Sequence, residues 1–118
     1  MLNTILSAQL DVDIKRNDDA KFTLTFTDPN DSNNPFDLSA FTTLTMQARN
    51  KDDLAFELIL ADGLEVSGAG NNLLTITISS ERSNLSRKEY SYDIEGDDAG
   101  VITTILEGTL IVSEDVTR

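Results

Sequence analysis

Alternation of apolar and polar residues recurs in segment after segment, and this pattern most constrains the fold. In Thr43 to Arg49, the residues Leu44, Met46 and Ala48 share one face while polar residues occupy the other. Because successive side chains of a strand point to opposite faces, such a segment is typical of a half-buried β-strand. The same pattern appears in residues 10–15, 22–26, 54–60, 64–66, 74–78 and 90–94, and a long last strand is predicted at residues 101–112. The sequence therefore predicts about seven to nine short strands.

Turn-forming residues separate these segments. Asp28 to Pro35 is rich in Asp, Asn and Pro and predicts a loop, and Gly96 to Gly100 predicts a turn. Ser79 or Ser80 is a suitable N-cap for one short helical turn near residues 80–86. Short strands at this spacing, with no helix long enough for a parallel crossover, favour an all-β fold. We expect an antiparallel two-sheet sandwich of immunoglobulin-like type.

Alternation also assigns the predicted core. In the first strand Leu10, Val12 and Ile14 share the inward face, and three phenylalanines fall on apolar faces of later strands: Phe22, Phe26 and Phe56. Burial of such side chains is the main favourable term in folding. We expect these residues in the core.

Two strands near the C-terminus carry features that the core pattern does not explain. Tyr90 and Tyr92 face inward by alternation, so one hydroxyl is expected to bond back to the backbone, as in sandwich corners. Gly108 interrupts the inward face of the last strand. This glycine indicates either a bulge or a place where an aromatic ring lies against the backbone.

The chain length of 118 residues is typical of one domain, which we place at residues 9–118. Ahead of it, residues 1–8 form either a first edge strand or an arm that docks on a neighbouring copy. The apolar side chains of this segment are candidate subunit contacts: Met1, Leu2, Ile5 and Leu6. Strand addition at an unpaired sheet edge is a natural way for such an arm to bind.

The charge balance excludes some classes of partner. Nine Lys and Arg stand against 21 Asp and Glu, for a net charge of −12. Nucleic acid binding depends on cations that displace phosphate counterions, so no nucleic acid partner is expected. No apolar run reaches the 18 residues of a membrane span, and the N-terminus lacks the features of a secretory signal, so we expect cytoplasmic synthesis without membrane insertion.

Composition argues against catalysis. The chain has no His and no Cys, which removes imidazole bases, thiol nucleophiles and the usual transition-metal ligands. Acidic residues are so abundant that no single carboxylate pair is informative. We therefore expect no enzyme activity, no catalytic residues and no cofactor.

One loop has part of a calcium-binding pattern. Asp28, Asn30 and Ser32 have the every-second-residue oxygen spacing of a calcium loop, but Asn33 and Ser39 stand where a glycine and a bidentate Glu belong. No metal site is assigned on this basis. A looser site, formed by Asp28 and Asp31 or by Asp97 and Asp98, remains an alternative.

Five segments of the chain form a set of motifs: Arg16-Asn17-Asp18, Pro35-Phe36-Asp37-Leu38-Ser39, Met46-Gln47-Ala48-Arg49, Tyr90-Ser91-Tyr92-Asp93 and Glu107-Gly108 through Val112 to Asp115-Val116-Thr117. Together they resemble a family of small bacteriophage virion domains. Members of that family have an Arg-Gly-Asp-like segment, a Pro-x-Asp-Leu-Thr turn, a Met-x-x-Arg strand, a Tyr-x-Tyr-Asp strand and an ending Glu-Gly-x-x-x-Val followed by Asp-Val-Thr. Asn17 and Ser39 depart from the family pattern.

The resemblance covers nearly the whole chain and includes the N-terminal domain of baseplate upper proteins. It implies a non-enzymatic virion protein of the tail, baseplate or neck, present in many copies and bound to other virion proteins and to itself. The resemblance also implies a protein that is made in the cytoplasm of the bacterial host and located in the virion. The alternatives are a capsid decoration protein, and a calcium- or carbohydrate-binding β-sandwich module.

Overall fold

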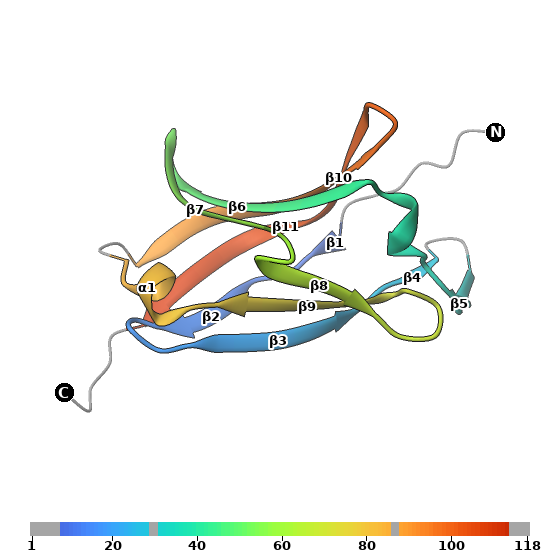
Figure 1. The fold of residues 1–118 in the computed structure, drawn as a ribbon. Helices are drawn as coiled ribbons and strands as arrows, with labels where there is room; N and C mark the ends of the chain where they lie inside the picture. Colours follow the sequence, from blue (N-terminus) through green and yellow to red (C-terminus); the bar gives the residue numbers. More distant parts are fainter. Residues whose placement is uncertain (1–7, 29–30, 86–87, 114–118) are drawn as a thin grey trace.

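The computed structural model describes residues 8–28, 31–85 and 88–113, and these residues form a mostly β fold (Figure 1). A single short α-helix in this part of the chain, α1, covers Ser80–Ser83, and a 3-10 helix, η1, covers Leu38–Ala40. The strands are β1 Ala8–Gln9, β2 Val12–Lys15, β3 Ala20–Thr25, β4 Thr27–Asp28, β5 Asp31–Pro35, β6 Thr43–Asn50, β7 Asp53–Leu60, β8 Gly63–Ser67, β9 Leu73–Ile78, β10 Glu89–Asp98 and β11 Val101–Ser113.

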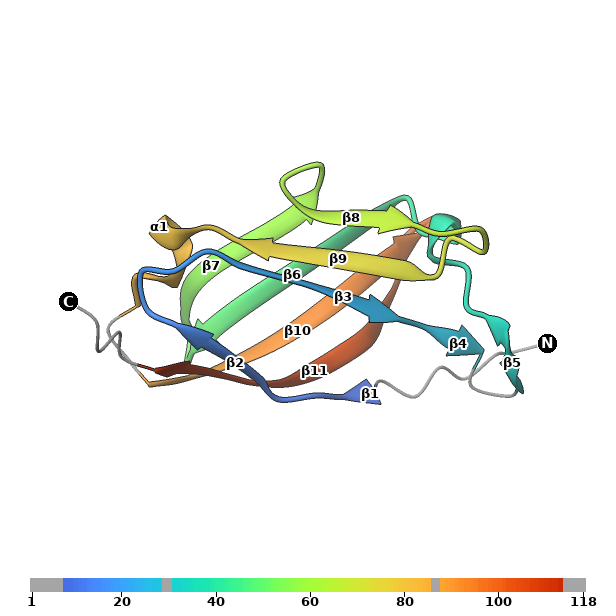
Figure 2. The ribbon, with the colours of Figure 1, turned by 90° about the horizontal axis from the view of Figure 1, so that it is seen from below.

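Nine of these strands belong to one hydrogen-bonded sheet. Its order is β1-β11-β10-β6-β7-β8-β9-β3, with β2 also paired to β11, while β4 and β5 form a separate two-stranded sheet. Figures 1 and 2 show that β6, β7, β10 and β11 lie over one side of the core and β3, β8 and β9 over the other. Within the described residues, strand pairing joins the two groups where β7 meets β8, at the pairs Ile59–Gly63 and Leu60–Leu64.

Three of the strand pairings are parallel, which the sequence did not predict. β1 and β2 both run parallel to β11, and β7 runs parallel to β8. The expectation of a purely antiparallel arrangement is therefore corrected, and the expected division into two separate sheets is not confirmed. For β1 and β2 the physical reason is that the first segment pairs with the last strand instead of with its chain neighbour β3. Alternation within a segment does not determine which strand that segment pairs with.

β1 and β2 are one strand interrupted at Leu10 and Asp11. Both halves keep the same register on β11, from Ala8 opposite Leu106 to Lys15 opposite Ser113. In the gap, the Asp11 carboxylate accepts a hydrogen bond from the Thr109 backbone N–H at 3.1 Å, in place of a backbone carbonyl. The interruption turns Leu10 outward, where it is 39% exposed. The prediction that Leu10 is buried is thus wrong, whereas the burial of its neighbours in β2 is confirmed.

Gly108 lies where this interrupted strand comes closest to β11. A β-carbon on Gly108 would overlap the Leu10 carbonyl oxygen. Its register partner on β10 is Tyr92, whose hydroxyl donates a hydrogen bond to that same carbonyl. The glycine therefore marks a close backbone approach, and the predicted bond from a tyrosine hydroxyl to the backbone is confirmed.

The core is formed by the inward residues of the long strands. Phe56 is buried, and Phe22 and Phe26 are partly buried against the same cluster. The largest fully buried apolar side chains are Leu38, Leu44, Met46, Leu58, Leu64, Leu74, Ile76, Ile78, Ile94 and Leu110. No helix among residues 8–28, 31–85 and 88–113 is long and apolar enough to cross a membrane.

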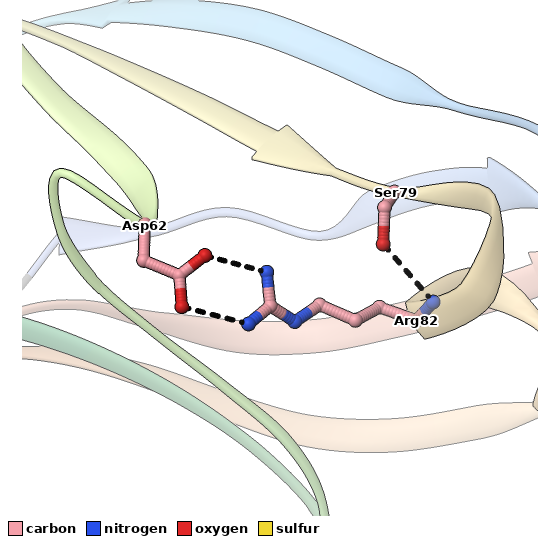
Figure 3. Close-up of polar contacts among 3 residues, drawn as sticks. All are labelled: Asp62, Ser79 and Arg82. Atoms are coloured by element: carbon pink, nitrogen blue, oxygen red, sulfur yellow. Dashed lines mark hydrogen bonds and ion pairs between the residues drawn. The ribbon is translucent and has the colours of Figure 1, made fainter.

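The predicted helical turn is confirmed as α1. The Ser79 side chain accepts a hydrogen bond from the Arg82 N–H at 3.3 Å and so caps the first turn. The Arg82 guanidinium forms a two-point ion pair with Asp62, which fastens this helix to the β7–β8 turn (Figure 3). Leu85, just beyond the helix, packs against the core cluster as expected.

Two predicted connections contain strands. The segment predicted as a loop from Asp28 contains part of the β4–β5 hairpin, a short pairing that turn-rich residues do not reveal. The predicted turn at Gly96–Gly100 is shorter, because β10 continues to Asp98. Gly96 lies within β10, and the Phe41 ring occupies the space where a β-carbon at this position would lie.

Asn17 occupies a turn position that ordinarily favours glycine. Its φ is +68°, in the left-handed region that Asn tolerates better than most residues. The replacement of the resembling family's glycine by Asn17 is thus compatible with a left-handed turn.

Substitution of Gly108 tests the close approach of β1 and β2 to β11. We expect Gly108→Ala to lower the free energy of unfolding by about 3 kcal/mol, because the new methyl group displaces backbone and not a flexible side chain. Gly100→Ala is the comparison: Gly100 has a φ of +92° but open space around it, so a loss of about 1 kcal/mol is expected. Chemical denaturation measures both, and equal losses would contradict this account.

The raised pKa of Tyr92 predicts how the stability of the fold changes at alkaline pH. Burial, aided by the Asp11 carboxylate, raises the pKa of Tyr92 to about 12. The unfolded chain loses this proton near pH 10 while the folded chain keeps it, so stability is lost between about pH 10 and pH 12. We expect this loss to be smaller in Tyr92→Phe, and the tyrosinate absorbance step near pH 12 to disappear. Persistence of that step in Tyr92→Phe would contradict the assignment.

Candidate interaction surfaces

A row of polar side chains crosses the outer face of five neighbouring strands. The strand register places Gln9, Glu107, Asp93, Gln47 and Glu57 side by side on β1, β11, β10, β6 and β7. The Gln9 amide donates to Glu107 at 3.3 Å, and the Gln47 amide donates to Glu57 at 2.6 Å. Each amide thus binds the glutamate beside it, while the carboxylates of Asp93 and Glu107 are direct neighbours in the row.

Arg49 lies beside this row and places a positive charge next to it. Its guanidinium donates to the Gln47 side-chain oxygen at 2.7 Å. Around these residues is an open groove of about 400 Å³, lined also by Lys51, Ser91 and Thr109. The pKa of Asp93 is raised by burial, against the attraction of Arg49 and with the repulsion of Glu107. The groove is shallow and polar, unlike the enclosed apolar pockets that bind most small ligands.

A second groove, which we call the end groove, lies beside α1. It has a volume of about 370 Å³ and is lined by Asn50, Asp53, Leu54, Ala55, Asn84, Leu85 and Tyr90. Leu54 is 49% exposed, and the Asn50 side chain spans to the Glu89 carbonyl at 3.4 Å. Apolar side chains therefore reach the surface at this end of the molecule.

The β10–β11 hairpin projects from the opposite end of the molecule (Figure 1). We call residues 97–102 the tip. Val101 and Ile102 are each 65% exposed, and a β-carbon on Gly100 would meet nothing within 4 Å. Because Val101 and Ile102 are adjacent in a strand, their side chains point to opposite faces, so the tip is apolar on both sides.

Cations gather at one end of the fold. Of the nine Lys and Arg, all except Arg87 and Arg118 lie in the described part of the chain. They come from the β2–β3 turn and its flanks, the β6–β7 turn, α1 and the start of β10, all near the α1 end (Figures 1 and 2). These residues are Lys15, Arg16, Lys21, Arg49, Lys51, Arg82 and Lys88.

The tip end carries negative charge without cations among the residues described. Asp97 and Asp98 lie in the tip, and Asp28 and Asp37 lie in the neighbouring β4 and the cap of η1. Hydrogen bonds from Ser39 lower the pKa of Asp37, which keeps that carboxylate charged. The α1 end, by contrast, carries both signs of charge. The molecule is therefore electrically polar along its length.

The candidate contact and metal-binding residues from the sequence analysis do not coincide with the two grooves. Met1, Leu2, Ile5 and Leu6 lie outside the described residues, so their role as subunit contacts stays a prediction; Ala8, which ends that segment, belongs to β1. Within residues 8–28, 31–85 and 88–113, no group of three or more acidic side chains is arranged to hold a metal ion. The Asp97 carboxylate instead accepts the Gly100 N–H at 2.8 Å and stabilises its own turn.

Sequence reasoning missed the end groove, the tip and the gathering of cations. The sequence analysis placed Val101 and Ile102 at the start of a long last strand without assigning their faces, so their exposure was not predicted. Runs without Lys or Arg, such as residues 22–48 and 52–81, were the available signal for the charge distribution. Where the cations lie in space depends on which turns meet at one end of the fold.

Comparisons with known proteins identify a fold and no family. No protein-family model matches the chain, and no curated protein matches it. Among solved structures, a chicken T-cell receptor is similar over 92% of this chain and 55% of its own, with 11% identity and a TM-score of 0.52. This likeness shows an immunoglobulin-like fold alone.

Two further structures are less similar. A marsupial T-cell receptor aligns with 92% of this chain and 51% of its own at 12% identity and a TM-score of 0.47. An endo-fucoidan hydrolase of glycoside hydrolase family 107 aligns with 93% of this chain and 13% of its own at 17% identity and a TM-score of 0.46. The chain thus spans at most about half the length of these structures.

The raised pKa of Asp93 predicts a stabilising substitution. Burial disfavours the charged carboxylate, so the folded state holds the Asp93 proton more tightly than the unfolded state does. We expect Asp93→Asn to raise the thermal midpoint at pH 7, with the difference shrinking as the pH falls through the folded pKa. Asp13→Asn, at an exposed position of β2, controls for the loss of one negative charge. A lower midpoint for Asp93→Asn at pH 7 would contradict the prediction.

Proposed function

We propose that this chain is a non-enzymatic structural component of a bacteriophage or prophage particle, in the tail, baseplate or neck, and that it works through protein–protein contacts. The immunoglobulin-like fold is compatible with this role but does not specify it, since one fold serves many functions. Support for the virion assignment comes from the motif resemblance, and support for the contact role comes from the surface. We also propose the finer fold description, two facing sheets that form a sandwich.

The observation that carries the proposal is that the resembling motifs fall on residues with defined structural roles. Asp37 caps η1 through its bond to the Ser39 N–H at 2.8 Å, and Met46 is fully buried. Tyr92 and Gly108 together hold the first strand against β11. These residues support a scaffold and supply no reactive group. A protein that shares them therefore shares the scaffold, as virion domains of this kind would.

The surface supports a role in binding proteins. The two ends and the outer face are open and combine exposed aliphatic side chains with charged groups, as expected of contact surfaces. The apolar segment with Met1, Leu2, Ile5 and Leu6 is proposed as a further contact to neighbouring virion proteins. Partners are thus other virion proteins and further copies of this chain.

Particle composition tests the proposed function. Particles are induced from the source bacterium, purified, separated into heads and tails, and analysed by mass spectrometry. We expect the chain in the tail fraction, in many copies per particle. Recovery with heads would favour a capsid decoration protein, and absence from all particles would overturn the virion proposal.

Incorporation tests the N-terminal contact separately. A chain lacking residues 1–7, which leaves the Ala8 pairing of β1 in place, is supplied to particles whose own copy is deleted. We expect its incorporation to fall at least about tenfold while its thermal midpoint stays near that of the full chain. Undiminished incorporation would exclude this segment as a contact.

A further inference from the structure

We propose that residues 1–7 of one copy bind as an added strand along the open edge of β3 in a neighbouring copy. This inference rests on the proposed function, in which the apolar N-terminal segment is a contact between copies, and it names the surface that receives the segment. β3 is the last strand in the order of the large sheet, and among the described residues it pairs with β9 alone. One edge of β3 is therefore unpaired in this part of the chain.

Alternate residues of β3 direct their backbone groups to this edge. Phe26 directly follows β3, and its N–H donates at 2.8 Å to the carbonyl of Asn72, which directly precedes β9. Because bonded residues alternate along an antiparallel pair, the even-numbered residues of β3 bond to β9. The N–H and C=O groups of Lys21, Thr23 and Thr25 therefore point to the open edge. A row of this kind is a template for strand addition.

The core is less well covered beneath β3 than beneath β9. The inward residues of β3 are only partly buried: Ala20, Phe22 and Leu24. Their register partners on β9 are each no more than 1% exposed: Leu74, Ile76 and Ile78. Aliphatic side chains of an added strand would cover this side of the core and remove further apolar surface from water. The open edge thus combines backbone groups with an incompletely covered apolar side.

Residues 1–7 have a suitable length and pattern for this edge. At about 3.4 Å per residue, seven extended residues span about 24 Å, which is enough to cover the six residues of β3. In an extended segment Leu2, Thr4 and Leu6 share one face, because side chains alternate. The two leucines can therefore cover the partly buried side of β3, and Ile5 lies on the opposite, outer face.

The direction of β1 assigns the segment to a neighbouring copy. β1 begins at Ala8 opposite Leu106 and runs parallel to β11, from the tip end toward the α1 end (Figure 1). To lie along β3 of the same copy, residues 1–7 would require a reversal around Ser7 and Ala8, a place without Gly, Pro, Asn or Asp. They would then run parallel to β3, in the less stable of the two pairings. The edge of a neighbouring copy can be approached in the antiparallel direction.

Charge permits this contact and opposes others. A chain with a net charge of −12 repels its copies at most approaches. Residues 1–10 contain no charged side chain, and between Asp19 and Asp28 the only charged residue is Lys21. Pairing of the segment with β3 therefore brings no carboxylate of the segment against this edge. Contact between the outer faces of two copies would instead bring the carboxylates of two polar rows together.

The symmetry of the assembly follows from the contact. A segment and an edge are two different surfaces, and each copy offers one of each. Two copies can exchange segments reciprocally, or each copy can pass its segment to the next in a ring or a filament. Each arrangement is suited to a component that is present in many copies.

Disulfide trapping between copies provides the decisive experiment, because the chain has no cysteine of its own. One chain carries Ile5→Cys, and a second chain, distinguished by a mass tag, carries Thr23→Cys at an exposed position of β3. Thr43→Cys, at an exposed position of β6, is the matched control for Thr23→Cys. The chains are mixed and oxidised, and mass spectrometry identifies the linked peptides.

We expect Ile5→Cys to be trapped by Thr23→Cys about tenfold more than by Thr43→Cys, since cysteines whose Cα atoms are more than about 7 Å apart do not bridge. Light scattering over a concentration series measures the contact without cysteines. Self-association should weaken about tenfold in a chain lacking residues 1–7 and in Thr25→Pro, which removes an edge N–H. Thr25→Ala keeps that N–H and should associate like the wild type. Circular dichroism checks the folding of each variant.

Four outcomes would overturn the proposal. They are a wild-type chain that is monomeric at all concentrations, a chain lacking residues 1–7 that associates like the wild type, equal trapping by Thr23→Cys and Thr43→Cys, and trapping that occurs only when Ile5→Cys and Thr23→Cys are in the same chain. None of these removes the proposed function, which stands or falls on particle composition. Conversely, trapping between copies of a chain that is absent from particles would preserve this contact and exclude the virion role.

Discussion

The parallel pairing of the first segment with the last strand is the constraint on which the rest of the structure depends. It brings residues 8–15 against β11 from nearly a hundred residues away, and the chain then crosses to the other side of the core as β3. The pairing is possible because Gly108 leaves room for the Leu10 carbonyl, which Tyr92 then satisfies. Asp11 replaces the missing backbone acceptor. In this interruption the Leu10 carbonyl and the Thr109 N–H are thus each hydrogen-bonded to a side chain.

This pairing also decides what the two ends of the molecule contain. Because β2 runs parallel to β11, the β2–β3 turn with its cations lies at the same end as the β6–β7 turn and α1. The β10–β11 hairpin and the acidic residues around it are left at the other end. An antiparallel first strand would have sent Lys15 and Arg16 toward the tip. The placement of Lys15 and Arg16 at the α1 end therefore follows from one strand direction.

Much of the fold was predictable from local pattern, and the surfaces were not. Each of the eight segments predicted as strands contains one, α1 lies where Ser79 can cap a helix, and the Tyr92 hydroxyl bonds to the backbone as expected. Leu10 was misassigned because the strand is interrupted beside it, and the exposure of Val101 and Ile102 was not predicted because the local pattern does not show where a strand leaves the core. Whether a face is covered depends on strands distant in the sequence. The candidate surfaces therefore depend on how strands and turns that are distant in the sequence come together in the fold.

The sequence by itself determined the longer strands, most of their inward faces, the short helix and the absence of imidazole and thiol groups. These properties depend on neighbouring residues, since period-two alternation and capping operate over a few positions. The tertiary structure alone decided which strands pair, in which direction, and which turns meet at each end. Alternation is satisfied equally by a parallel or an antiparallel neighbour, so that choice is made by backbone hydrogen bonds and close approaches between distant residues, such as Gly108 and Leu10.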